Sequence, residues 1–304
     1  MLAVLCPGQG GQHEHMLDLL LDDAAAARVL NDVEHTSGAH PRRWAADAER
    51  IFDNEVAQPL LCVAQYAAWS SLRTIVPAPT AFAGYSVGEL AAYGCAEACT
   101  ADELLRLAME RARIMHNASE GRNGGMLALR GIDRRRLDGL CAGRDAWVAI
   151  VIDDAAFVVG GTLAALAQIQ DDLQETDVKL TCLKVGVASH TPLLAGAVTP
   201  FRLVLEQSAL RAPSFPVVSG IDGAVRSVRA SITDALARQL AETLEWSRCL
   251  TALHERGCRV FLELGPGRAL TNMVRDRFPD ASARSLDDFR SLSGAAAWVR
   301  RELS

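Results

Sequence analysis

A serine between two glycines has the surroundings that best suit nucleophilic chemistry in this chain. The segment Gly84–Gly88 reads Gly-Tyr-Ser-Val-Gly; it follows the apolar stretch Thr80–Ala83 and precedes the helix-forming stretch Glu89–Ala98. A strand, the pattern G-x-S-x-G and a helix together make a nucleophile elbow, which projects the serine hydroxyl from the C-terminal edge of a sheet. The helix N-terminus then points N–H groups and a positive dipole end toward a developing oxyanion. We therefore predict Ser86 as a nucleophile, with an ordinary Gly/Ser turn as the alternative.

A second glycine-rich junction follows the first apolar segment. Leu2–Cys6 has the composition of a buried strand, and Pro7–Gln12 reads Pro-Gly-Gln-Gly-Gly-Gln. Three glycines let a backbone approach a ligand closely. A phosphate-binding loop is one interpretation, although neither Gly-Lys-Ser/Thr nor G-x-G-x-x-G with a later acidic partner is present. The other is that a backbone N–H near Gln9 donates to an oxyanion, and spacing alone leaves this open.

Possible partners for the serine come from two further segments. His190 stands in Val187–Pro192, just before an expected helix start at Pro192. A lone histidine is more often structural, but we expect a domain junction here, and clefts between domains commonly bind ligands. An amphipathic helix after Thr100 carries three arginines, at 106, 111 and 113. Surface positions are the simplest interpretation of all three.

The elements that must position these residues form two units. We predict a large α/β-hydrolase-like subdomain from residues 1–122 and 190–304, and an inserted small subdomain from residues 123–189. Within the insertion, strands are expected at 126–130, 147–152, 156–159 and 178–185, and helices at 133–141 and 162–173. This βαββαβ order is the ferredoxin-like pattern.

The large subdomain is expected to be built on a parallel sheet. Leu2–Cys6, Thr80–Ala83 and Arg259–Leu264 are apolar, and a glycine-containing turn follows each of them. In open α/β sheets ligands bind beyond the carboxyl ends of the strands, so we expect the three turns to face one cleft. Helices are predicted at 16–34, 193–209, 231–243, 246–256 and 269–278, and another with Pro59 in its first turn.

Composition excludes several classes of protein. The 304 residues are 50% hydrophobic and 22% charged, which allows a sizeable core, and the net charge of −6 argues against a nucleic-acid surface. Neither a basic leader nor an apolar run of membrane-spanning length is present, so we expect no membrane contact and a cytoplasmic protein. The eight cysteines are scattered and the seven histidines lack ligand spacing, which predicts reduced thiols and no metal site.

Six motifs follow one another along the chain: Pro7–Gln12, Gly84–Glu89, Met109–Met115, Val187–His190, Arg238–Leu240 and Leu264–Gly267. In this order they give the chain a resemblance to the malonyl-CoA:acyl-carrier-protein transacylases. Tyr85, where the fatty-acid enzymes usually have histidine, and the run Ala91–Cys95 look like the epsilon subunit of malonate decarboxylase, which we rank first.

The resemblance implies a role for each matching residue. It makes Ser86 the acylated nucleophile, His190 its general base and the backbone N–H groups of Gln9 and Val87 the oxyanion hole. It also implies that Arg111 binds the free carboxylate of the acyl group, that the main-chain carbonyl of Gln239 orients the histidine, and that Gln58 helps to position Arg111. A carbonyl can hold the imidazole tautomer without a carboxylate, and no aspartate is placed to complete a triad. The segment Ile150–Ala156 departs from the family pattern, so no site residue is carried over there.

The implied reaction transfers a malonyl group from malonyl-CoA, through a malonyl-serine ester, to a carrier thiol. No cofactor or metal is expected, because the coenzyme A thioester is itself the substrate. The implied partners are an acyl-carrier protein with a phosphopantetheine-type arm and other malonate decarboxylase subunits. One alternative is a malonyl transferase of fatty-acid or polyketide synthesis. Others are a catalytically idle docking subunit and a serine thioesterase or esterase, for which the only later histidine, His254, has no evident acid partner.

Overall fold

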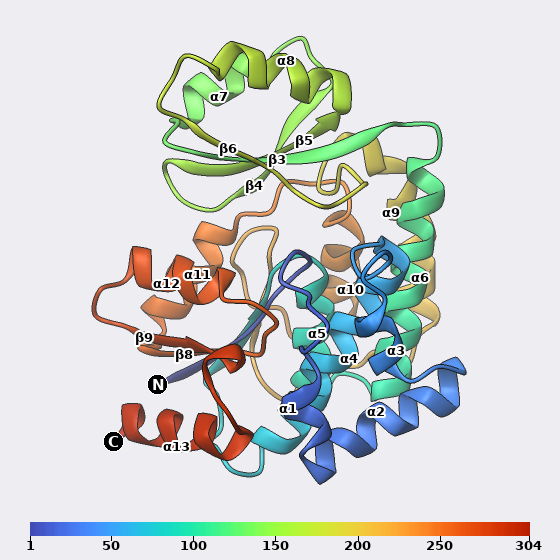
Figure 1. Ribbon diagram of the computed structural model, residues 1–304, viewed down its shortest axis with the longest axis vertical. Helices are drawn as coiled ribbons and strands as arrows, with labels where there is room; N and C mark the ends of the chain where they lie inside the picture. The colour runs from blue at the N-terminus through green and yellow to red at the C-terminus, as the bar shows by residue number, and fades with distance from the viewer.

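A five-stranded parallel sheet forms the centre of the larger part of the molecule. The computed structural model describes residues 1–304 (Figure 1). The strand order is β7-β2-β1-β8-β9, and every pair is parallel. The strands are β1 (Leu2–Cys6), β2 (Ala81–Gly84), β7 (Val217–Val218), β8 (Val260–Glu263) and β9 (Ser282–Ser285). The predicted parallel sheet is confirmed, whereas β9 was not predicted.

The central strands are buried on both faces. All residues of β1, β2 and β8 are buried, which explains their nearly continuous apolar sequences. In β1, Val4 and Cys6 pack into a cluster with helices α4, α5 and α13, whereas Ala3 and Leu5 pack against α11 and α12 on the other face. Successive side chains of a strand point to opposite faces, so one short strand supports two cores.

Helices cover both faces of this sheet. They are α1 (Asp18–Leu21), α2 (Ala24–Ser37), α3 (Pro41–Ala46), α4 (Asn54–Leu72), α5 (Val87–Cys95), α6 (Ala101–Ser119), α9 (Ala195–Gln207), α10 (Arg229–Arg238), α11 (Trp246–Glu255), α12 (Ala269–Arg277) and α13 (Leu292–Leu303), with short 3₁₀ helices at Pro192–Leu194 and Leu286–Asp288. None of the helices is long and apolar enough to cross a membrane.

Three helix predictions were wrong in detail. The helix predicted over 231–243 is α10, which already ends at Arg238. The helix predicted over 16–34 is two helices, because Asp23 caps α2 by accepting hydrogen bonds from the N–H groups of Ala25 and Ala26. Helix α4 begins at Asn54, so Pro59 lies inside the helix and not in its first turn. Helix α13 was not predicted.

A four-stranded antiparallel sheet forms the smaller part, at the top of Figure 1. Its strands are β3 (Gly124–Arg130), β4 (Ala146–Val151), β5 (Ala156–Thr162) and β6 (Lys179–Cys182), in the order β4-β5-β3-β6, and its helices are α7 (Arg134–Cys141) and α8 (Leu163–Leu173). The predicted βαββαβ ferredoxin-like order is confirmed. Strand β6 is shorter than predicted, since the strand ends at Cys182.

The two sheets are packed together through one apolar cluster. Met126, Ile150 and Val158 of the antiparallel sheet share a core with Ala3 and Leu5 of β1. The N–H of Val151 also donates to the carbonyl of Leu244 at 2.8 Å. The small sheet therefore has a fixed position above the carboxyl ends of β1 and β2, where Pro7–Gln12 and Ser86 are found.

Candidate active site

Ser86 occupies a strained turn between β2 and α5. Its backbone has φ 57° and ψ −120°, a conformation that residues with a Cβ rarely adopt. The flanking glycines have no room for a side chain: a Cβ on Gly84 would lie 2.1 Å from the nitrogen of Glu89, and one on Gly88 2.0 Å from the carbonyl oxygen of Cys6. The predicted strand–turn–helix context is confirmed, and it places the hydroxyl at the carboxyl edge of the sheet.

His190 faces Ser86 from the segment that returns from the small sheet. Its Nε2 lies 2.8 Å from the Ser86 hydroxyl, and its Nδ1 lies 2.6 Å from the carbonyl oxygen of Gln239. A carbonyl only accepts hydrogen bonds, so Nδ1 carries the proton and Nε2 presents its lone pair to Ser86. Burial and then the charge of Arg111 lower the pKa of His190 to about 3, although the hydrogen bond to Gln239 opposes the shift. The imidazole is thus neutral at physiological pH.

Two backbone N–H groups beside Ser86 have no acceptor in the protein. They belong to Val87, the first residue of α5, and to Gln9, and both residues line the same cavity as Ser86. The Gln9 side chain donates to Oδ1 of Asn54 at 3.1 Å, which holds the glycine-rich loop against α4. Two free donors at the end of a helix dipole can stabilise an oxyanion.

Arg111 is a buried cation in this cavity. Only 2% of its surface is exposed, and no carboxylate pairs with it. Its guanidinium donates to Oε1 of Gln58 at 2.7 Å, to Oε1 of Gln239 at 3.3 Å and to the sulfur of Met115 at 3.2 Å. Its Nε–H and one further N–H keep no protein acceptor. Burial lowers the pKa of Arg111 to about 10, which still leaves it charged near neutrality.

The neighbouring arginines of α6 differ from Arg111 in their surroundings. Arg106 pairs with Glu103 and Arg113 with Glu110, and the side chains of both arginines are about half exposed, at 46% and 54%. The surface interpretation is therefore confirmed for these two and wrong for Arg111. Sequence spacing placed Arg111 on a different face of the helix, but only packing shows that this face is buried.

Apolar residues of the small sheet and its return segment form part of the cavity wall. Met126, Ile150, Leu183 and Val185 line the cavity together with Ser86. Asn54 also lines it and was not predicted as a site residue; its Oδ1 accepts from Gln58 as well as from Gln9. The only sequence signal for Asn54 is that it precedes the apolar stretch of the helix that contains Pro59.

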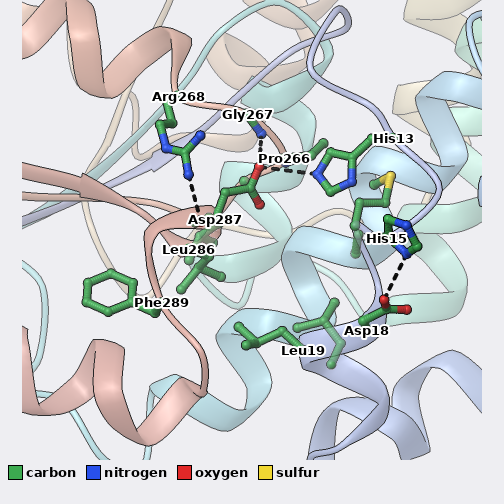
Figure 2. Close-up of a pocket in the computed structure, with 15 residues that line it drawn as sticks. His13, His15, Asp18, Leu19, Pro266, Gly267, Arg268, Leu286, Asp287 and Phe289 are labelled. Atoms are coloured by element: carbon green, nitrogen blue, oxygen red, sulfur yellow. Dashed lines mark hydrogen bonds and ion pairs between the residues drawn. The ribbon is translucent and has the colours of Figure 1, made fainter.

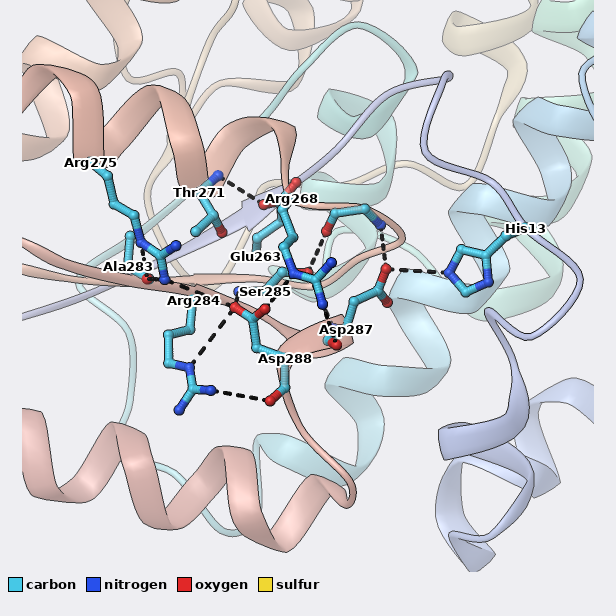
Figure 3. Close-up of polar contacts among 11 residues, drawn as sticks. His13, Glu263, Arg268, Thr271, Arg275, Ala283, Arg284, Ser285, Asp287 and Asp288 are labelled. Carbon is cyan, nitrogen blue, oxygen red and sulfur yellow. Dashed lines mark hydrogen bonds and ion pairs between the residues drawn. The ribbon is translucent and has the colours of Figure 1, made fainter.

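One predicted feature of the cleft was wrong. The Gly265–Gly267 turn does not line the Ser86 cavity but a second, larger one, which is shown in Figure 2. There Asp287 accepts from the N–H of Gly267 at 2.7 Å and from Nε2 of His13 at 3.2 Å (Figure 3). Two of the three strand-end turns, Pro7–Gln12 and Gly84–Gly88, therefore line the Ser86 cavity. The third, Gly265–Gly267, packs against Gly11 of the glycine-rich loop.

The remaining titratable candidates lie away from Ser86. His254 does have an acid partner, contrary to expectation: its Nε2 lies 3.1 Å from Oδ1 of Asp280. This pair is outside the Ser86 cavity, and the imidazole stacks on Phe278 at 4.2 Å, so it does not complete a hydrolase triad. Asp153 accepts from the N–H of Ala155 in a surface turn. No group of three or more His, Cys, Asp or Glu residues is arranged to hold a metal ion.

Comparison with known proteins is consistent with this geometry. The family model described as "Acyl transferase domain" matches residues 4–287. The chain belongs to the acyl transferase family. This acyl transferase is 30% identical to the malonyl CoA-acyl carrier protein transacylase of Mycobacterium bovis, over 94% of its own length and 96% of that protein. The predicted acyltransferase and its resemblance to the malonyl-CoA:acyl-carrier-protein transacylases are confirmed.

Solved structures give the same result for the fold. FabD from Acinetobacter baumannii superimposes on the acyl transferase with a TM-score of 0.92 and 27% identity, covering 99% of this chain and 98% of that one. A malonyl-transacylase solved with a type II polyketide synthase acyl-carrier protein has a TM-score of 0.91 and 27% identity, covering 97% and 99%. None of these relatives is named as a malonate decarboxylase subunit.

Proposed function

We propose that this acyl transferase moves a malonyl group from coenzyme A to the thiol of an acyl-carrier protein through an ester on Ser86. The observation that carries the proposal is the unpaired Arg111 guanidinium in the cavity that holds the Ser86–His190 pair. A buried arginine without a carboxylate partner is costly unless a ligand supplies one. A malonyl thioester has one carboxylate to pair with Arg111 and one carbonyl to face Ser86.

The first half of the reaction acylates the serine. Nε2 of His190 takes the Ser86 proton as the oxygen attacks the thioester carbonyl. The N–H groups of Gln9 and Val87 stabilise the resulting oxyanion, at about 3–4 kcal/mol per donor. The carbon–sulfur bond then breaks, and the departing coenzyme A thiolate takes the proton from the imidazolium. The Gln239 carbonyl holds the Nδ1 proton throughout.

The second half repeats these steps with a different thiol. His190 takes the proton of the carrier thiol, whose sulfur attacks the malonyl ester carbonyl. The bond to the Ser86 oxygen breaks, and the serine recovers its proton from the imidazolium. Between the halves the ester must be kept from water. The apolar residues Met126, Ile150, Leu183 and Val185 fit that requirement.

The pathway is a separate question from the reaction. Tyr85 and the run Ala91–Cys95 led us to rank malonate decarboxylase first, but the relatives support fatty-acid or polyketide synthesis better. We therefore place the transfer in fatty-acid or polyketide synthesis. Transfer rates to an acyl-carrier protein of fatty-acid synthesis and to the carrier subunit of malonate decarboxylase, measured side by side, distinguish the two pathways.

Intact-mass spectrometry after mixing with malonyl-CoA tests the reaction itself. A stable malonyl adduct that maps to Ser86 and disappears on addition of carrier protein is the expected result. Immediate release of free malonate without carrier would indicate a hydrolase, and a complete lack of adduct would indicate a docking protein. Either outcome contradicts the proposal.

A further inference from the structure

A fully buried carboxylate lies behind the Ser86 cavity, and the mechanism described above does not use it. Glu89 stands in the first turn of α5 and has no exposed surface. Its Oε2 accepts hydrogen bonds from the N–H of Gly220 at 2.8 Å and from Nε2 of Gln239 at 2.5 Å. Burying an acid in this way is unfavourable, and burial raises the pKa of Glu89 to about 7.

Gln239 connects this carboxylate to both Arg111 and His190. Its Nε2 donates to Glu89, its Oε1 accepts from Arg111 at 3.3 Å, and its main-chain carbonyl accepts from Nδ1 of His190 at 2.6 Å. The residue is 1% exposed and follows the last residue of α10. Gln239 thus has a hydrogen bond with each of Glu89, Arg111 and His190.

When Glu89 is ionised, the orientation of the Gln239 amide depends on two charged neighbours, Glu89 and Arg111. A carboxylate only accepts hydrogen bonds and a guanidinium only donates them. With Nε2 toward Glu89 and Oε1 toward Arg111 both contacts are favourable, whereas the flipped amide would make both repulsive. Glu89 and Arg111 therefore select one amide orientation.

We propose that Glu89 is a positioning residue that acts through Gln239, setting the orientation of Arg111 and the placement of His190. Removing the carboxylate frees the Gln239 side chain, which leaves the guanidinium without one of its acceptors. It also loosens the residue whose carbonyl holds the imidazole. This inference rests on the proposed malonyl transfer and assigns to Glu89 a role that Ser86, His190 and Arg111 do not fill.

The test compares Glu89→Ala with Glu89→Gln. The glutamine keeps an oxygen that can accept from Gly220 and Gln239, so kcat/KM for malonyl-CoA should stay within about fivefold of wild type. The alanine should lower that value by about 10- to 100-fold and should lower the ratio of malonyl to acetyl transfer. Rates are divided by the fraction of enzyme that forms a Ser86 adduct, which removes losses from misfolding.

Glu263 supplies a matched control. It is also fully buried, and burial raises its pKa to about 7. Its carboxylate accepts from the N–H groups of Leu270 and Thr271, and Figure 3 shows Glu263 beside Thr271. It does not touch Gln239. Glu263→Ala should lower the free energy of unfolding while the malonyl-to-acetyl ratio of the folded enzyme stays at the wild-type value.

A double-mutant cycle with Gln239→Ala completes the test. This change removes the amide but keeps the main-chain carbonyl, and it should lower the malonyl-to-acetyl ratio even if Glu89→Ala folds poorly. Glu89→Ala and Gln239→Ala together should lower that ratio no more than the worse single change, because both act on one connection. Additive losses, an unchanged ratio in Glu89→Ala or Gln239→Ala, or a Glu89→Gln enzyme as impaired as Glu89→Ala would overturn the proposal. Failure of the wild type to form any Ser86 adduct would instead contradict malonyl transfer itself.

Discussion

The carbonyl oxygen of Gln239 lies 2.6 Å from Nδ1 of His190 and occupies the position that a carboxylate takes in a Ser-His-Asp triad. A neutral acceptor fixes the imidazole tautomer without adding a negative charge to the site. The charge that shifts the pKa of His190 is instead the cation of Arg111, which together with burial keeps the imidazole unprotonated. The site is therefore electrostatically suited to an anionic acyl group.

Arg111 determines which thioesters are used. We expect Arg111→Ala to lower kcat/KM for malonyl-CoA by tens- to thousands-fold, because a buried charge-assisted pair is worth about 2–5 kcal/mol. Acetyl transfer has no carboxylate to lose and should stay level or rise. Arg113→Ala, on an exposed face of the same helix, is the control and should leave both substrates unaffected. Equal losses for both thioesters would mean that Arg111 supports the fold.

The low pKa of His190 predicts an unusual pH profile. kcat/KM reports the ionisation of the free enzyme, so its acid limb should fall well below 6.5, where an ordinary histidine titrates. Removing the Arg111 charge takes away one cause of the shift, and Arg111→Ala should move the limb to higher pH. Acetyl-CoA is the substrate to use, since it does not depend on the arginine. A wild-type limb near 6.5 that Arg111→Ala leaves in place would contradict this electrostatic account.

His190 should matter far more than Asp153 and Asp154, the two aspartates in the turn between β4 and β5. His190→Ala is expected to slow malonyl transfer by about 10²–10⁴-fold, the usual contribution of a general base. Asp153→Ala and Asp154→Ala should transfer at nearly the wild-type rate, because these residues lie in a surface turn of the small sheet. A comparable loss in either aspartate variant would reveal a triad that the structure does not contain.

The strained backbone of Ser86 predicts that two inactive variants differ in stability. Ser86→Ala and Ser86→Gly should both fail to form an adduct with malonyl-CoA. Glycine tolerates the positive φ of 57°, so the free energy of unfolding of Ser86→Gly should exceed that of Ser86→Ala by about 1 kcal/mol or more. Denaturant titrations of the two variants measure this difference. Malonyl transfer that persists in either folded variant would exclude Ser86 as the nucleophile.

The buried Glu263 should make stability depend on pH. Its folded-state pKa of about 7 exceeds the value of 4.5 for a free side chain, so between these values the native state binds more protons than the unfolded state. The free energy of unfolding of wild type, minus that of Glu263→Gln, should therefore fall as pH rises from about 4.5 to 7 and then level off. Urea titrations of both proteins at several pH values measure this difference in the free energy of unfolding. A difference that rises between pH 4.5 and 7 would contradict the prediction.

Local sequence patterns were sufficient for much of the framework. Apolar runs that end in glycine turns predicted β1, β2 and β8, because a strand buried on both faces must be apolar throughout. The glycines around Ser86 predicted the elbow, since only glycine fits that close approach. The βαββαβ insertion followed from its alternating elements. By contrast, β9 is a short edge strand with the sequence Ser-Ala-Arg-Ser, which has no comparable apolar signal.

The assembly of the site depended on the tertiary structure. His190 reaches Ser86 across 104 residues of chain, and nothing in its own sequence distinguishes it from a structural histidine. The acceptor that orients it is a main-chain carbonyl, which every residue possesses, so only the resemblance pointed to Gln239. Among the three arginines of α6, the packing of the helix decided which one is buried and unpaired. Sequence specifies which residues can do the chemistry, whereas long-range packing decides which of them meet, because burial and distance are properties of the folded chain.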